Sequence, residues 1–353
     1  MIRVAWLQAR TQTAVLFGAL AIAAILLAIT GPHLVHLYNV NVVACGAHGN
    51  CDAATATFLH NDRTVRTWLG IFVIVVPGII GLFWGAPLVA RELESGTYRL
   101  AWTQSVTRTR WLAVKLAVVG VLGMVVAGLF SFMVTWWASP IDTVNGNRMS
   151  PTIFDQRGVV AIGYVAFAFA LGVAAGVVTR RTLPAMAITL VGFMFARLAT
   201  IHWLRPNFIA PLHRVVALEG ARMGFGSSNS GAMTLQPEAP PIPGAWIYST
   251  RIVDSTGHAL TPQVLAGTCP HIGDVLRPPT PVPGRSVRAV VPPGAKDVLR
   301  QCVAKVGVTY HEVVTYQPGK SYWAIQGYEL ALFLGAALLL CAFSFWLVRR
   351  RLS

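Results

Sequence analysis

Six long apolar stretches constrain the fold of this chain more than any other feature. A helix needs about 20 mostly apolar residues to cross the hydrocarbon core of a bilayer. These stretches are apolar on all sides and lack the polar face of a helix that packs on a soluble core. They therefore predict an all-α membrane protein with six transmembrane helices, at about residues 13–30, 69–90, 111–138, 158–178, 183–204 and 327–348.

The composition agrees with a lipid environment. Charged residues make up only 12% of the chain, against about 25% in a typical soluble domain. The net charge of +15 would suggest a nucleic-acid partner if the protein were soluble. Membrane proteins, however, concentrate Lys and Arg in their cytoplasmic segments. We therefore expect the lipid bilayer as a partner of this chain, and no nucleic acid.

The distribution of Lys and Arg predicts the orientation. If the N-terminus is cytoplasmic, the inner segments hold twelve Lys and Arg residues and the short outer loops hold four. The positive-inside rule then places both termini in the cytoplasm of a multi-pass protein, which we expect in a bacterial plasma membrane. The first apolar stretch shows no usual cleavage site after it, so we interpret it as an uncleaved first helix.

This topology divides the chain into three parts. Residues 1–204 form a membrane domain with five helices, and residues 327–353 form the sixth helix and a basic cytoplasmic tail. Residues 205–326 form a large extracellular segment between helices 5 and 6. It is rich in Pro and Gly, and alternating apolar residues near 308–316 are typical of a strand, so we expect it to be irregular and partly β.

Four of the five cysteines lie outside the apolar stretches, in two groups. The grouping and the predicted outer location suggest the disulfides Cys45–Cys51 and Cys269–Cys302. Four free thiols are the alternative. No spacing of Cys and His matches a zinc site, so we predict no bound metal.

The connection between the second and third helices is the most charged short stretch of the chain. Gly96 can end the second helix in a left-handed cap. The following residues can form a short helix that lies across the membrane face, with Tyr98 and Trp102 on one side of it. Such an element can dock into a groove of another protein, with its aromatic side chains as anchors.

This connection resembles the first intracellular loop of ABC-2 type permeases, the membrane subunits of one class of ATP-binding cassette exporters, and it is most similar to an actinobacterial group of them. The family pattern is an acidic pair near the end of the second helix, then Gly-Thr and a short coupling helix. It is matched by Arg91-Glu92-Leu93-Glu94-Ser95-Gly96-Thr97, and the same group has stretches similar to residues 100–105, 155–158, 180–185 and 322–351.

The resemblance implies a partner and a mechanism. A separate cytoplasmic ABC ATPase would bind the coupling helix, and a second permease subunit would complete a homodimer or heterodimer around a central pathway. The residues at the ATPase interface would be Glu92, Glu94, Gly96, Thr97, Tyr98, Arg99, Trp102 and Gln104. The chain would then export a hydrophobic or amphipathic substrate, such as a drug, lipid or peptide.

The chain itself has no ATPase motif. Gly319-Lys320-Ser321 resembles the end of a P-loop, but that motif also needs a glycine where this chain has Val314. We therefore expect no enzyme activity and no cofactor in this chain, with ATP and Mg²⁺ bound by the partner ATPase. Two other functions stay open: a sensor or scaffold built on the same membrane fold, and a membrane-bound enzyme with an extracellular site.

Two features inside the apolar stretches concern packing and the pathway. Arg197 either faces the bundle interior, as a candidate pathway residue, or extends outward to the membrane surface. The pairs Gly81/Gly85 and Gly172/Gly176 permit close helix contacts, which we expect within one subunit rather than between two.

Overall fold

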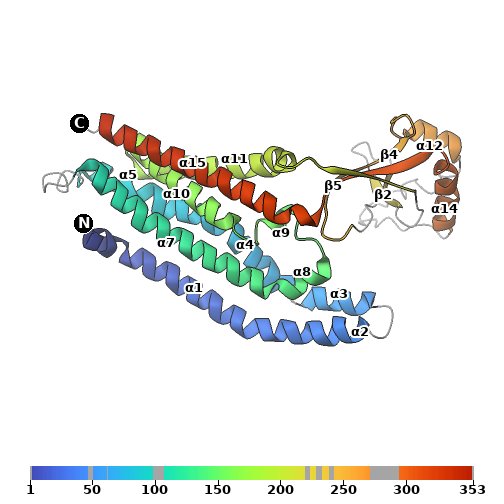
Figure 1. Cartoon of the computed structure of the whole chain (residues 1–353), viewed down its shortest axis with the longest axis horizontal. Coiled ribbons are helices and arrows are strands. Elements are labelled where there is room, and N and C mark those ends of the chain that lie inside the picture. Colours follow the sequence, from blue (N-terminus) through green and yellow to red (C-terminus); the bar gives the residue numbers. More distant parts are fainter. Residues whose placement is uncertain are drawn as a thin grey trace, which may run out of the picture. The chain divides into compact units, whose positions relative to one another are not determined.

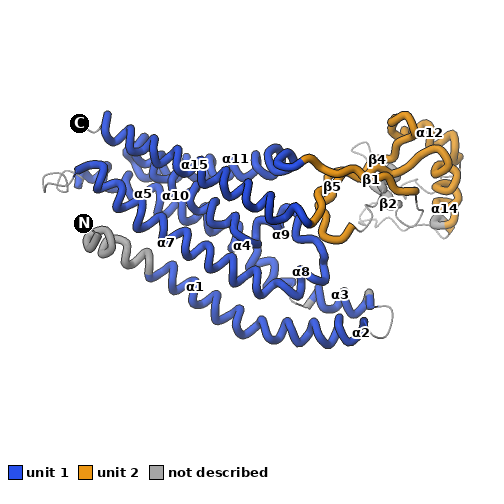
Figure 2. Tube along the Cα trace, viewed as in Figure 1, with its two compact units in different colours: residues 1–209, 320–353 blue, residues 210–319 orange. Residues whose placement is uncertain are grey.

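The computed structural model describes residues 2–46, 51–61, 63–97, 107–218, 223–227, 233–237, 242–270 and 294–351. These residues form helices and a few short strands (Figure 1). They divide into two compact units, Met1–Ile209 with Lys320–Ser353 as unit 1, and Ala210–Gly319 as unit 2 (Figure 2). The sequence analysis put the corresponding boundaries at 204/205 and 326/327, a few residues away. Each unit is described separately below.

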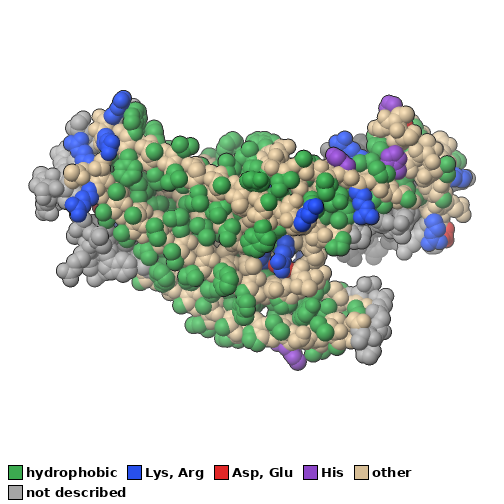
Figure 3. Space-filling model, viewed as in Figure 1, with side chains coloured by type: hydrophobic (Ala, Val, Ile, Leu, Met, Phe, Trp, Pro, Cys, Tyr) green, Lys and Arg blue, Asp and Glu red, His purple; other side chains and the backbone are tan. Residues whose placement is uncertain are grey.

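Unit 1 contains helices that are long and apolar enough to cross a membrane. Six spans meet this criterion in the described part of the chain, as the sequence predicts. Their bounds are Ala14–Gly46, Arg63–Ser95, Arg108–Trp137, Val160–Thr179, Thr182–Asn207 and Gly319–Arg350. Exposed apolar side chains cover the length of this unit (Figure 3). Lipid is the solvent that such a surface requires.

The spans are built from consecutive helical elements. The long helices are α1 (Ile2–Tyr38), α4 (Arg63–Ile80), α7 (Arg108–Trp137), α10 (Val160–Thr179), α11 (Thr182–Ala199) and α15 (Tyr322–Arg351). Short α-helices are α2 (Ala44–Gly46), α3 (Asp52–Asn61), α5 (Ala86–Ser95), α8 (Ser139–Asn145) and α9 (Pro151–Phe154). The π-helical turns η1 (Asn39–Val43), η2 (Gly81–Gly85) and η3 (Thr200–Leu204) extend the spans, and η4 (Arg205–Asn207) and η6 (Gly319–Ser321) are 3-10 turns.

The first helix extends further than its hydropathy predicts. The apolar stretch ends near residue 30, but α1 continues through Pro32 to Tyr38. Contacts with α7 accompany this extension: the indole of Trp137 donates a hydrogen bond to the hydroxyl of Thr30 (2.9 Å). A Cβ at Gly31 would lie 3.1 Å from the ring of Trp136. Tertiary packing therefore stabilises a helix in which proline removes one backbone hydrogen bond.

Helix α10 is the centre of unit 1. It is buried along most of its length, whereas the other spans are largely exposed. It packs against α4, η2, α5, α7, α11 and α15. Glycines permit the closest of these contacts, since a Cβ at Gly172 would lie 2.5 Å from the carbonyl oxygen of Gly81, and one at Gly85 would lie 2.6 Å from that of Phe169. The predicted packing of the two glycine pairs within one subunit is confirmed.

Unit 2 contains the β structure predicted for the outer segment. Strands β1 (Leu212–Val216), β5 (Tyr310–Gln317) and β4 (Trp246–Asp254) form an antiparallel sheet in the order β1-β5-β4. A second sheet pairs β2 (Met223–Ser227) with β3 (Met233–Pro237). Helices α12 (Pro262–Thr268) and α14 (Ala295–Val306) enclose a small apolar core.

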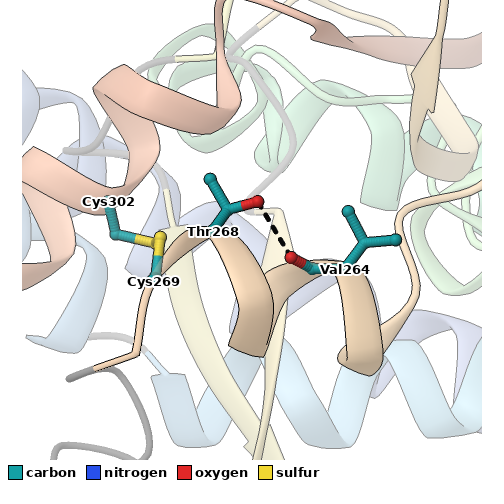
Figure 4. Close-up of a disulfide and its surroundings, with 4 residues drawn as sticks. All are labelled: Val264, Thr268, Cys269 and Cys302. Carbon is teal, nitrogen blue, oxygen red and sulfur yellow. Dashed lines mark hydrogen bonds between the residues drawn. A yellow bond between two sulfur atoms is a disulfide. The ribbon is translucent and has the colours of Figure 1, made fainter.

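Both predicted cysteine pairs lie at disulfide distance. In unit 2, Cys269 follows α12 and Cys302 belongs to α14, and their Cα atoms are 5.5 Å apart (Figure 4). In unit 1, the Cα atoms of Cys45 and Cys51 are 5.8 Å apart. The bond in unit 2 joins the two helices of a very small core across a sequence separation of 33 residues. Closing a loop of that length stabilises a fold by about 4 kcal/mol.

Candidate functional site

The end of unit 1 at which α5 ends and α7 begins carries the predicted coupling segment. We call it the basic end, because Lys and Arg side chains gather there, near the C-terminus of α15 (Figures 1 and 3). Gly96, with a φ of 73°, ends α5 in the left-handed conformation that the sequence predicts. Thr107 then caps α7 by accepting a hydrogen bond from the backbone N–H of Arg110 (3.3 Å). Both ends of the coupling segment are therefore fixed by local caps.

The coupling residues are only partly described. Thr97 is exposed immediately after the Gly96 cap, and its hydroxyl lies 3.0 Å from that of Ser95. Tyr98, Arg99, Trp102 and Gln104 lie outside the described residues.

Glu92 has a partner within the chain. Its carboxylate lies 2.5 Å from the ammonium group of Lys115 on α7, and the two side chains are 19% and 7% exposed. Lys115 also donates a hydrogen bond to the carbonyl oxygen of Leu88 (3.3 Å) and lies over the ring of Trp111. These contacts connect the last turns of α5 with the first turns of α7, on the two sides of the coupling segment.

Glu94 connects α5 to a third helix. Its carboxylate accepts hydrogen bonds from the backbone N–H (3.0 Å) and the hydroxyl (2.8 Å) of Thr182, the first residue of α11. A carboxylate is favoured there, because the first N–H groups of a helix lack partners within the helix and carry partial positive charge. Glu92 and Glu94, both predicted to face an ATPase, therefore also position α5 against α7 and α11.

The opposite end of unit 1, which we call the far end, holds a buried network of charged side chains. The guanidinium of Arg205 forms two hydrogen bonds of 2.8 Å with the carboxylate of Glu329 on α15. The same guanidinium contacts Asp155 at the end of α9, and Arg197 of α11 lies 2.6 Å from the other oxygen of Asp155. The hydroxyl of Tyr164 on α10 lies between these two carboxylates, within hydrogen-bond distance of both, and its one proton is shared between them.

We call these five side chains the far-end network: Asp155, Tyr164, Arg197, Arg205 and Glu329. All five are buried, and two positive charges balance two negative ones. Aromatic rings cover both cations, since Arg197 lies over Tyr164 (3.9 Å) and Arg205 over Phe154 (4.3 Å). Such compensation is what permits charges at this depth of a membrane protein. Arg197 is therefore buried in the bundle and does not extend outward to the membrane surface, while its role in a pathway stays a prediction.

A second polar cluster lies beside this network. Gln326 of α15 accepts hydrogen bonds from the backbone N–H groups of Val159 and Val160 (3.1 Å each), at the start of α10. Its amide nitrogen donates to the carbonyl oxygens of Phe154 (3.1 Å) and Arg157 (3.0 Å). One side chain thus connects α15 to the loop before α10 and satisfies the unpaired N–H groups of that helix start.

The sequence analysis missed most of the far-end network. Arg197 was singled out, and Asp155 and Glu329 belong to stretches quoted for the family resemblance without a role of their own, but Tyr164 and Arg205 were not identified as site residues. Glu329 carried a usable signal, because a carboxylate inside an apolar stretch indicates a buried partner. Among the described residues, no group of three or more His, Cys, Asp or Glu side chains could hold a metal ion.

One comparison with known proteins gives a match. A family model described as ABC-2 membrane transporter related matches residues 17–205, more than half of the 353-residue chain. The match includes the second, third and fourth spans, nearly all of the first and fifth, both ends of the coupling segment, and all of the far-end network except Glu329. No curated protein and no solved structure matches the chain significantly.

Proposed function

Because this chain belongs to the ABC-2 membrane transporter-related family, we propose that it is the transmembrane subunit of an ABC exporter. Its helical unit would move a hydrophobic or amphipathic substrate, such as a drug, lipid or peptide, out of the cell. A separate cytoplasmic ATPase would bind ATP and Mg²⁺ and supply the energy. The protein would lie in a bacterial plasma membrane, with the basic end of unit 1 in the cytoplasm.

The observation that carries this proposal is the structure around the coupling segment. The segment leaves α5 at Gly96 and enters α7 at Thr107, two ends fixed by caps. Two pairs connect α5 with its neighbours in the bundle: Glu92–Lys115 joins α5 to α7, and Glu94–Thr182 joins α5 to α11. A push on the segment would therefore reach α5, α7 and α11 together.

The proposed mechanism follows from these connections. Closure of an ATPase dimer on ATP would displace the segment with Tyr98, Arg99, Trp102 and Gln104. Helix α5 would pass the movement to α10, against which η2 and α5 pack at glycine contacts. Because close-packed helices shift as rigid bodies, a displacement at the basic end can change the packing along the whole bundle. A second permease subunit, identical or different, would complete the pathway.

Co-purification tests the proposal. The chain is expressed with the ABC ATPase encoded beside it, and the two are followed through detergent chromatography. We expect a stable complex, and its loss in the double variant Trp102→Ala/Glu94→Ala. The control Trp136→Ala changes an exposed tryptophan near the other end of α7 and should leave the complex intact. Failure of the unmodified chain to bind any such ATPase would remove the proposed function.

A further inference from the structure

A cavity at the far end of unit 1 has the properties of a binding site. It has a volume of about 530 Å³ and is lined by residues from α3, α4, α8 and α9. Ligand sites in proteins commonly have volumes of about 300–1,000 Å³. From its polarity and position we propose that this cavity binds an anionic membrane lipid, with the headgroup at Arg66 and an acyl chain along Ile71 and Ile74. The inference concerns binding alone and does not depend on the proposed export.

The polarity of the cavity changes along α4. Thr67, Ile71 and Ile74 follow one another at helical spacing on one face, and Arg66 lies beside Thr67. With a rise of 1.5 Å per residue, Arg66 and Ile74 are separated by about 12 Å along the helix axis. The cavity wall that α4 forms therefore changes from charged to apolar along the helix, and Ile141 of α8 and Ile153 of α9 add to its apolar lining. An amphiphilic lipid changes in the same direction, from a charged headgroup to an apolar acyl chain.

The depth of the cavity also fits a lipid. Arg66 lies three residues after Arg63, where the second membrane span begins. Trp68, one turn from the start of this span, is exposed, as is Trp136 near the end of α7. Tryptophans at the ends of spans mark the level of the lipid headgroups. Arg66 therefore lies at headgroup level, and Ile71 and Ile74 follow it along α4 toward the acyl region.

The charge of the lining selects an anion. Asp142 is the acidic residue of the lining, and it is already paired with Arg157, whose Nε lies 3.1 Å from its carboxylate. Arg66 has no ion pair with any carboxylate in the described part of the chain. The lining therefore keeps one uncompensated positive charge, on Arg66. Side-chain amides of Asn145 and Asn147 offer further hydrogen-bond donors to a headgroup.

The shape of the cavity depends on a close contact between α4 and the loop after α9. A Cβ at Gly70 would lie 2.4 Å from the amide nitrogen of Gln156, so the Gln156 side chain lies directly on the helix backbone. Both the buried Asp142–Arg157 pair and this contact hold the wall of the cavity in place. The cavity is thus preformed, which lowers the entropy cost of binding.

Native mass spectrometry of the purified chain in detergent tests this inference. The probes are palmitoyl-oleoyl phosphatidylglycerol and phosphatidylcholine, which differ in headgroup charge and share their acyl chains. We expect phosphatidylglycerol to bind with the higher affinity. Arg66→Ala should weaken its binding about fivefold, which corresponds to about 1 kcal/mol for one interfacial charge. Arg63→Ala removes an exposed arginine one turn away, outside the cavity lining, and should change the affinity less than about twofold.

Two further measurements distinguish the binding of a lipid from the binding of a free anion. Ile74→Gln, with the headgroup contact intact, should also weaken phosphatidylglycerol binding, and glycerol phosphate at the same concentration should not compete. Competition by glycerol phosphate would mean a site for a free anion and would overturn the proposal. Equal losses in Arg66→Ala and Arg63→Ala, or no preference for phosphatidylglycerol, would overturn it as well. If Arg66→Ala aggregates, Arg66→Gln replaces it, with the melting temperature (Tm) as the check on folding.

Discussion

The two ends of the helical unit use charged side chains in different ways. At the far end, two arginines and two carboxylates are buried together, and the Tyr164 hydroxyl lies within hydrogen-bond distance of both acids. At the basic end, Glu92 is paired with Lys115 but keeps 19% of its side chain exposed, and Glu94 bonds to a helix start at the surface. Breaking a buried network leaves charges without water, whereas a partly exposed carboxylate can exchange its partner for solvent.

This difference gives the two ends different mechanical properties. The far-end network joins α9, α10, α11, η4 and α15 by contacts that cannot open without a large cost. The contacts at the basic end hold α5 against α7 and α11 but can rearrange at a lower cost in free energy. Under the proposed function, a rigid far end and a basic end that can rearrange would suit a subunit driven from its basic end. The predictions below test the comparison, from the largest expected effect to the smallest.

Removing Arg205 should have the largest effect on stability. Arg205→Met leaves Glu329 and one oxygen of Asp155 buried without their cation, and such a loss costs about 3–5 kcal/mol. We expect a large decrease of Tm for the chain in detergent. Thermal unfolding is measured by tryptophan fluorescence. The control Arg148→Met removes a 46% exposed arginine that lies 3.7 Å from Asp142, and it should cost less than about 1 kcal/mol.

A second substitution that removes the partner charge tests whether the loss of stability comes from charge imbalance. The double variant Arg205→Met/Glu329→Met removes one charge of each sign and leaves Asp155 paired with Arg197. It should recover most of the lost stability, because hydrophobic replacement of a whole buried pair is often neutral. No recovery, or equal losses in Arg205→Met and Arg148→Met, would argue against a balanced buried network.

Removing the tyrosine hydroxyl should have an intermediate effect. Tyr164→Phe keeps the ring beneath Arg197 but removes the donor to Asp155 and Glu329. A buried acceptor that loses its donor costs about 1–3 kcal/mol. Tyr328→Phe, at an exposed position on α15, is the matched control and should change stability by less than about 0.5 kcal/mol. Similar Tm values for the two variants would mean that the Tyr164 hydroxyl does not contribute to the stability of the network.

Breaking the ion pair at the basic end should affect coupling more than stability. Lys115→Met leaves the 19% exposed Glu92 without its cation but in partial contact with water, so the loss should be about 2 kcal/mol, below that of Arg205→Met. The connection between α5 and α7 is lost, and we expect the chain to accelerate ATP hydrolysis by its partner less than the unmodified chain does. Both quantities are measured on one preparation, as Tm and as the release of phosphate. A loss of stability as large as that of Arg205→Met would remove the distinction between the two ends.

The smallest effect on stability is expected for Glu94→Gln. Its side chain is exposed, and glutamine retains an oxygen that can accept the hydrogen bonds from Thr182. We expect an unchanged Tm and a modest decrease in ATPase stimulation, because the negative charge at the start of α11 is lost. Glu94→Lys, which reverses that charge, should decrease stimulation further. The idea fails if both variants stimulate the ATPase as the unmodified chain does.

The sequence predicted the spans better than their ends. Each apolar stretch corresponds to a span, because the length of apolar sequence needed to cross a bilayer is fixed. The ends were missed because hydropathy does not report backbone structure: Arg63, Glu92 and Glu94 are polar and still helical. Pro32 lies inside α1, although proline usually marks an end. The helix continues past Pro32 because α1 packs on α7, and the local sequence does not show this tertiary contact.

The site was predictable only in part. The Gly96 cap followed from a local rule, and both disulfides followed from grouping and topology. The far-end network joins residues as distant in sequence as Asp155 and Glu329, and their pairing depends on how α9, α10 and α15 pack. Sequence analysis left Arg197 with an inward and an outward interpretation, and without the fold it could not indicate a partner for it.

The rate of ATP hydrolysis in liposomes tests the central claim most directly, namely that the segment between α5 and α7 couples this chain to an ATPase. The ATPase encoded beside this chain is reconstituted with the unmodified chain, with Trp102→Ala and with Trp136→Ala. We predict that the unmodified chain and Trp136→Ala accelerate hydrolysis equally, and that Trp102→Ala does so far less at an unchanged Tm. Equal acceleration by all three, or none by the unmodified chain, would contradict the account.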